Sequence, residues 1–226
     1  MAFILNIHTA TEVAMVSIAE NEKVIDVAEN RQQKDHAAFL HIAIQNLLHK
    51  AGLPVTRLEA VAVTAGPGSY TGLRIGMSAA KGLCYALNIP MITLNTLEVM
   101  AQSCIIQLRE KEALYCPLID ARRMEVFTAV YDTSLTAIVK PCAMVLDNSS
   151  FKDLLATNAI YFSGSGAPKL EAVLQHEYAH FTRYPLIPDA MATLSGKNFT
   201  KKNFADIRSA SPVYLKEFYT PTKGAT

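Results

Sequence analysis

The sequence predicts an α/β protein of two lobes, each built around a mixed β-sheet. A strand, a glycine-containing turn, a long helix and a second strand follow one another through residues 60–97, which is the order of a βαβ unit. Three strand-like runs precede this unit, and three more strand-like runs followed by helix and strand patterns begin at residue 114. Half of the 226 residues are hydrophobic and 18% are charged, which is typical of a chain with a packed core.

The first half of the chain carries the clearest signals for individual elements. Apolar runs separated by polar turns predict an antiparallel meander of strands at residues 3–7, 13–19 and 24–28. An amphipathic helix is expected over residues 35–51, because Gly52 and Pro54 follow it. The next strand, helix, strand and helix are expected at residues 60–65, 71–87, 91–94 and 96–111. Ser69 or Thr71 can cap the second helix by accepting its free backbone N–H groups.

The second half repeats this order in outline. Strands are expected at residues 114–119, 125–131, 137–145 and 160–162, and helices at residues 151–156, 167–176 and 188–204. Asp120-Ala121-Arg122-Arg123 is expected to form the turn between the first two of these strands. The charged stretch that ends at Glu112 indicates a boundary. We therefore expect a first lobe over residues 1–110, to which the tail 205–226 returns, and a second lobe over residues 111–204.

The sequence GPGSYTG at residues 66–72 has two interpretations. Backbone N–H groups at the start of a helix form a natural anion site, so the loop can be a phosphate site. Alternatively, Gly66 and Gly68 only allow a tight turn from strand to helix. The lysine of a P-loop and the glycine spacing of a dinucleotide-binding loop are both absent. The residues by themselves therefore favour the structural interpretation.

Composition and charge argue against several classes of function. The net charge of +1 gives no bulk electrostatic argument for nucleic-acid binding. The four cysteines are scattered without a CxxC spacing, which indicates free thiols in a reducing compartment. The start MAFILNIH lacks the basic residues of a signal peptide, and no apolar run approaches the roughly 18 residues of a membrane helix. We therefore expect a cytoplasmic protein that does not enter a membrane.

Two predicted helices carry side chains that their own core does not need. On the helix over residues 35–51, steps of about 100° place one apolar face toward the core, formed by Leu40, Ala43, Ile44, Leu47 and Leu48. Another part of this helix presents Ala38, Phe39, Ile42, Asn46 and His49. On the helix over residues 71–87, one stripe contains Arg74, Ser78, Lys81, Gly82 and Tyr85, and the remainder is apolar or small. These side chains either lie at solvated edges and under loops or form a surface for a partner.

The histidines do not predict a metal site. His36, His41 and His49 lie at different azimuths of one helix, so each is expected to be a solvated polar residue. His176 and His180 formally match the zinc-protease motif HExxH. Such a site needs a third ligand, and no histidine follows His180. We interpret this segment as a solvated helix end.

Several motifs together resemble one known family. GPGSYTGLRIG followed by AAKGL closely resembles the signature of the TsaB (YeaZ) family, and ILNIHTAT, LNTLE, LIDARRMEVF and SPVYLKEF agree along nearly the whole chain. The proteins of that family are subunits of the bacterial machinery that makes threonylcarbamoyladenosine in tRNA, and they look like paralogues of its catalytic subunit TsaD. The resemblance implies a two-lobed actin/sugar-kinase-like (ASKHA) fold with duplicated mixed-sheet lobes.

Two departures from the patterns of these relatives bear on catalysis. Relatives carry an aspartate in the first hairpin, where it helps to hold nucleotide and metal, but this chain has His8 there. A neutral histidine cannot replace a carboxylate for a hard cation such as magnesium. The two metal-binding histidines of TsaD relatives fall on Thr96 and Met100, which cannot supply the same ligands. We therefore expect no catalytic residue, no cofactor site and no metal site in this chain.

The resemblance implies a noncatalytic subunit that binds TsaD and supports threonylcarbamoyl transfer to the adenosine beside the anticodon of tRNAs. The two helix faces described above are then the expected partner surface, which can also form a homodimer when TsaD is absent. TsaE, an ATPase, is expected in a larger complex, and tRNA is expected to be contacted only indirectly. The alternative is a stand-alone actin-like ATPase or kinase, or a metallopeptidase, against which His8, Thr96 and Met100 argue.

Overall fold

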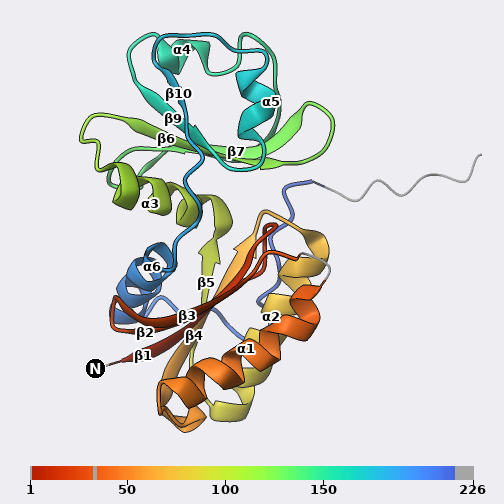
Figure 1. Ribbon diagram of the computed structural model, residues 1–226, viewed down its shortest axis with the longest axis vertical. Coiled ribbons are helices and arrows are strands. Elements are labelled where there is room, and N and C mark those ends of the chain that lie inside the picture. Colours follow the sequence, from red (N-terminus) through yellow and green to blue (C-terminus); the bar gives the residue numbers. More distant parts are fainter. Residues whose placement is uncertain (1, 33–34, 217–226) are drawn as a thin grey trace, which may run out of the picture.

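The computed structural model describes residues 2–32 and 35–216 and contains two five-stranded sheets, one above the other in Figure 1. The first sheet consists of β1 (Phe3–His8), β2 (Ala14–Glu20), β3 (Lys23–Asn30), β4 (Leu58–Gly66) and β5 (Met91–Asn95). Its order is β3-β2-β1-β4-β5, with antiparallel pairing among β1, β2 and β3 and parallel pairing of β1, β4 and β5. The predicted meander and the predicted βαβ unit are both confirmed.

The second sheet has the same topology as the first. It consists of β6 (Leu114–Asp120), β7 (Glu125–Tyr131), β8 (Ala137–Val145), β9 (Ile160–Ser163) and β10 (Ala179–Phe181). The order is β10-β9-β6-β7-β8, again with three antiparallel strands followed by two parallel ones. The prediction of duplicated mixed sheets is therefore confirmed, and β10 is a strand that the sequence analysis missed.

Helices cover both faces of the first sheet, and residues of β1 are buried on each face. Leu5 and Ile7 belong to a core cluster with buried residues of α1 (His36–Lys50) and α2 (Tyr70–Leu87). Ile4, on the other side of the strand, packs in a cluster with Met191 of α6 (Pro188–Thr200). α3 (Thr96–Leu108) lies between the two sheets and contacts β5 and β6. All five predicted core residues of α1 are buried.

Local sequence signals explain where the long helices begin and end. The Ser69 side chain accepts a hydrogen bond from Gly72 N–H at the start of α2, so Ser69 is the N-cap. Asn88 ends that helix in the left-handed conformation, at a φ of 54°. The Asn95 side chain accepts hydrogen bonds from the N–H groups of Leu97 and Glu98 and caps α3. None of the helices within the described ranges is long and apolar enough to cross a membrane.

The helices of the second lobe are shorter than expected. α4 spans Lys152–Leu155, and α5 spans Ala167–Glu171 rather than residues 167–176. α5 ends early because the chain must turn to bring β10 alongside β9. The sequence pattern did not reveal this strand pairing. Another short helix, η2 (Val55–Arg57), leads into β4.

α6 belongs with the first sheet, although the expected boundary at residue 204 assigned it to the second lobe. It packs against β1, β2, β3 and β5, because Ala190, Met191 and Leu194 complete the apolar cluster on that face. After α6 the chain stays beside the same lobe: Ala205 bridges to Met91, and Val213 N–H donates to the carbonyl of Ala65. We propose a first lobe formed by residues 2–110 and 188–216.

Candidate functional site

On the expected partner face of α1, Ile42 is the large apolar side chain that is exposed to solvent. The Ile42 side chain is 60% exposed, and Ala38, Asn46 and His49 are also exposed. Phe39 differs from the expectation, since it is half-buried and packs against the first core cluster. Ile42 is therefore the side chain on α1 that is free to anchor a partner.

Ala38, Phe39, Ile42 and Asn46 line an open groove of about 540 Å³ between α1 and the edge strand β3. Val27 and Ala28 form the β3 side of this groove, and the ion pair between Lys50 and Asp26, at 2.8 Å, borders it. Ile42 thus lies in a groove that apolar side chains of both elements line, together with polar ones such as Asn30 and Asn46.

The stripe on α2 faces a second groove, which has a volume of about 580 Å³ and lies between α1 and α2. Arg74, Ser78 and Gly82 line it from α2, and Ala37 and His41 line it from α1. Both sets repeat every four residues and so lie along one face of their helices. The sequence analysis missed Ala37 and His41, although their spacing was visible, because the position of α2 beside α1 was not.

Tyr85 and Gly82 leave the α2 surface open. The Tyr85 side chain is 84% exposed, which is unusual for a large aromatic residue. A Cβ atom built on Gly82 would meet no atom within 4 Å. The fold of this chain therefore does not require glycine at position 82, and the backbone there is accessible to another helix.

The two cations of the α2 stripe, Arg74 and Lys81, have partners within the chain. Lys81 Nζ donates to the carbonyl of Ala210 at 2.9 Å, and Arg74 Nε donates to Tyr214 Oη at 3.2 Å. The Arg74 guanidinium also lies 4.0 Å from the centre of the Tyr70 ring. The C-terminal strap, residues 205–216, thus lies along α2, a contact between segments that are distant in the sequence.

The glycine loop is explained by the close approach of the chain to itself. A Cβ atom on Gly66 would lie 2.4 Å from the Val213 carbonyl oxygen, and one on Gly68 would lie 2.2 Å from that of Ala10. Both residues also have positive φ angles, 126° and 157°. The structural interpretation of this loop therefore accounts for both glycines.

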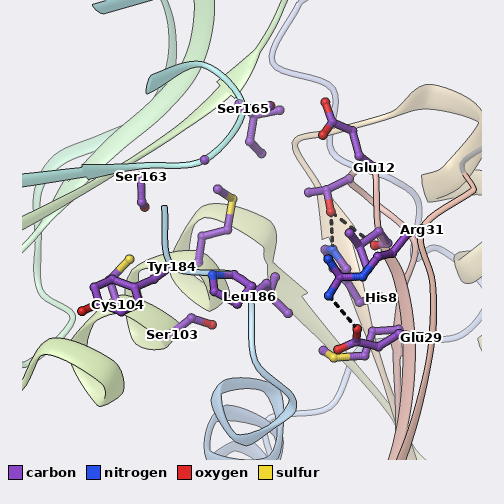
Figure 2. Close-up of a pocket in the computed structure, with 17 residues that line it drawn as sticks. His8, Glu12, Glu29, Arg31, Ser103, Cys104, Ser163, Ser165, Tyr184 and Leu186 are labelled. Carbon is purple, nitrogen blue, oxygen red and sulfur yellow. Dashed lines mark hydrogen bonds and ion pairs between the residues drawn. The ribbon is translucent and has the colours of Figure 1, made fainter. Parts of the chain in front are cut away.

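A small cavity between the lobes occupies the place where His8 meets the second lobe (Figure 2). Its volume is about 190 Å³, below the roughly 300–1,000 Å³ that is usual for small-molecule sites. His8, Glu12, Glu29 and Arg31 lie on the first-lobe side, and Arg31 is paired with Glu29 at 3.3 Å. Ser163 and Ser165 lie on the opposite side.

His8 is held as a neutral ring. It is 1% exposed, with Nδ1 3.2 Å from Thr64 Oγ1 and Nε2 2.8 Å from Thr11 Oγ1. Burial, assisted by repulsion from His36, lowers the pKa of His8 to about 3. His36 itself is only 2% exposed, so the expectation that it is solvated was wrong; it sits at the start of α1 against the Glu12 backbone.

This buried histidine predicts a pH dependence of stability. The unfolded state binds a proton near pH 6.5 and the folded state near pH 3, so stability is full above 6.5 and falls as pH drops through that window. His8 alone contributes a slope of about 1.4 kcal/mol per pH unit between these values. The free energy of unfolding, measured with urea at pH 7, 6 and 5, should depend less steeply on pH for His8→Gln than for the wild type. Equal slopes would contradict the neutral, buried histidine.

The chain matches the family model described as TsaD, tRNA N6-adenosine threonylcarbamoyltransferase, over residues 23–209. The chain belongs to this family. It is also 33% identical to the tRNA threonylcarbamoyladenosine biosynthesis protein TsaB of Bacillus subtilis and 35% identical to that of Escherichia coli. Each alignment covers 128 residues, 57% of this chain and 54% of the relative. The matched part thus spans about half the length of these relatives.

Two solved structures from Pseudomonas aeruginosa share the fold. One, titled YeaZ, has a TM-score of 0.83 and 23% identity, and covers 95% of this chain and 100% of the other. The second, titled an uncharacterized protein with similarity to peptidase YEAZ, has a TM-score of 0.84 and 22% identity, with 96% and 100% covered. The resemblance to the TsaB (YeaZ) family and the two-lobed fold that it implied are confirmed.

Thr96 and Met100 stand at the two positions that were compared above with the metal-binding histidines of TsaD relatives. Thr96 is buried at the start of α3, and Met100 lines the cavity between the lobes. His176 Nδ1 accepts a hydrogen bond from Tyr178 N–H, and His180 lies in β10 against the Tyr161 ring, so the HEYAH segment is not the helix end that was expected. Among residues 2–32 and 35–216, no three His, Cys, Asp or Glu side chains form a group that could hold a metal ion.

Proposed function

We propose that this protein is an accessory subunit that binds TsaD and supports threonylcarbamoyl transfer to the adenosine beside the anticodon of tRNAs. The observation that carries the proposal is the surface of α1 and α2, where Ile42, which lines the groove between α1 and β3, is 60% exposed and Tyr85 of α2 is 84% exposed. Large apolar and aromatic side chains in such a position are typical of protein interfaces. The transfer chemistry belongs to TsaD in this proposal.

The helix surface suits a partner that presents helices of its own. The absence of a side chain at Gly82 and the small side chain of Ser78 allow two backbones to approach closely. A partner of the same family, with an equivalent helix pair, would complete a four-helix contact. In its absence a second copy of this chain can use the same surface about a two-fold axis, which gives a homodimer that competes with the complex.

The direct test is co-purification with TsaD of the same organism, followed by sedimentation analysis of the mixture. We expect a one-to-one complex, to which TsaE, an ATPase, adds in a larger assembly. A TsaD that sediments unchanged in the presence of this chain would contradict the proposal.

The alternative, a stand-alone ATPase or kinase, has less support. The cavity between the lobes is small, and the position of the expected acid holds His8, whose pKa of about 3 keeps it neutral. Neither feature suits a magnesium–nucleotide complex. Titration calorimetry of the isolated chain with Mg-ATP should therefore give no measurable binding. Micromolar affinity that His8→Ala abolishes would restore the enzyme hypothesis.

A further inference from the structure

The turn between β6 and β7 places two arginines next to each other in an unfavourable backbone conformation. Arg122 and Arg123 have φ angles of 72° and 50°, and both are exposed. The turn is closed by the hydrogen bonds from Ala121 N–H to the Glu125 carbonyl and from Glu125 N–H to the Arg122 carbonyl. Glycine or asparagine suits such angles far better than arginine does. The geometry of the turn therefore does not explain why arginine occupies both positions.

Neutralisation of nearby acids does not explain them either. Asp120 Oδ1 accepts a hydrogen bond from Lys169 Nζ at 2.6 Å, and Glu125 is ion-paired with Lys216 of the C-terminal strap. Both carboxylates that flank the turn thus have lysine partners from other segments. No described residue forms a hydrogen bond or ion pair with either arginine side chain. Two adjacent guanidinium groups remain available to an external anion.

We propose that Arg122 and Arg123 bind phosphate groups of the tRNA backbone. A guanidinium is planar, always charged and able to bind two phosphate oxygens at once. Two adjacent guanidinium groups therefore suit a polyanion better than they suit an isolated carboxylate. The net charge of +1 describes the whole chain and does not exclude a local cationic site. This inference rests on the proposed function, since that function brings tRNA to the complex. It replaces the expectation that this chain contacts tRNA only indirectly.

The turn lies in the second lobe and meets the first lobe through the C-terminal strap, where Lys216 pairs with Glu125. It belongs to the second sheet, at the other end of the molecule from most of α1, and the Lys169 contact fixes it beside α5 (Figure 1). Arg122 and Arg123 are exposed there and lie outside the residues of the expected partner surface.

The test compares tRNA binding by the complex with TsaD before and after the turn loses its charge. Arg122→Asn/Arg123→Asn removes both cations and installs a residue that tolerates the left-handed conformation, so the fold is retained. With an unmodified tRNA transcript, we expect the dissociation constant to rise on the order of tenfold. The salt slope, which is the slope of the logarithm of affinity against the logarithm of salt concentration, should fall in magnitude by about 1 to 2. Arg122→Lys/Arg123→Lys should keep most of the salt slope.

The matched control is Lys201→Asn/Lys202→Asn, which removes two adjacent exposed cations, one of them also at positive φ (54°). It should leave tRNA affinity unchanged. Unchanged affinity and salt slope in the asparagine variant would overturn the proposal, as would a loss of TsaD binding without a change for tRNA. Complex formation by the wild type is measured first, so its failure counts against the proposed function alone. Titration of the isolated chain with the same transcript then decides the role of the turn.

Discussion

Ile42→Asp is expected to abolish binding to TsaD and self-association while the chain remains folded. The Ile42 side chain is 60% exposed and contributes nothing to the core clusters, so the fold tolerates a carboxylate there. In a complex the same carboxylate would be buried against apolar groups without a partner. Loss of a central anchor commonly costs about 2 kcal/mol or more of binding free energy. A TsaD pull-down and sedimentation velocity measure both outcomes.

Val145→Asp is the matched control for this variant. Val145 is 69% exposed on β8 of the second sheet, so the same kind of change is made at a site outside the surface of α1 and α2. We expect it to retain binding. An Ile42→Asp protein that is folded and still binds TsaD would show that another face is used. Phe39→Asp is not an equivalent test, because Phe39 packs against the core and its substitution is expected to lower stability.

Gly72→Ala and Gly82→Ala are expected to change stability in opposite directions, although both lie within α2. A Cβ atom on Gly72 would lie 1.9 Å from the Thr9 carbonyl oxygen, and the Gly72 carbonyl accepts a hydrogen bond from Thr9 Oγ1. We expect Gly72→Ala to cost about 3 kcal/mol, the upper range for overpacking. Gly82→Ala meets no atom and should add about 0.5 to 1 kcal/mol, because alanine favours the helix.

Urea unfolding of the two variants beside the wild type measures these changes. The comparison isolates the close approach of Thr9, in the hairpin turn after β1, to α2, since residue type, substitution and helix are the same in both. A Gly72→Ala protein as stable as the wild type would mean that the first hairpin is not packed against α2 as described. A destabilised Gly82→Ala protein would mean that the surface over Gly82 is already covered.

Relations between neighbours in the sequence determined most of the fold. Leu40, Ala43 and Ile44 repeat at helical spacing, and that spacing alone assigned them to the core. Ser69 caps α2 because its side chain reaches an N–H group three residues ahead, which is a local interaction. The same kind of signal predicted the three-strand meander, the βαβ unit and their recurrence in the second lobe.

Tertiary structure decided which side chains of the predicted surface are free. Phe39 and Ile42 lie on the same helix, but only the packing of the first lobe makes Phe39 half-buried and leaves Ile42 exposed. The position of Lys81 on its helix predicts a solvated cation, yet Lys81 donates a hydrogen bond to the carbonyl of Ala210, which is 129 residues away in the sequence. The assignment of α6 to the first sheet and the burial of His36 depended on similar distant contacts. A helical period fixes the direction in which a side chain projects, whereas the segment that meets it is set by the path of the whole chain.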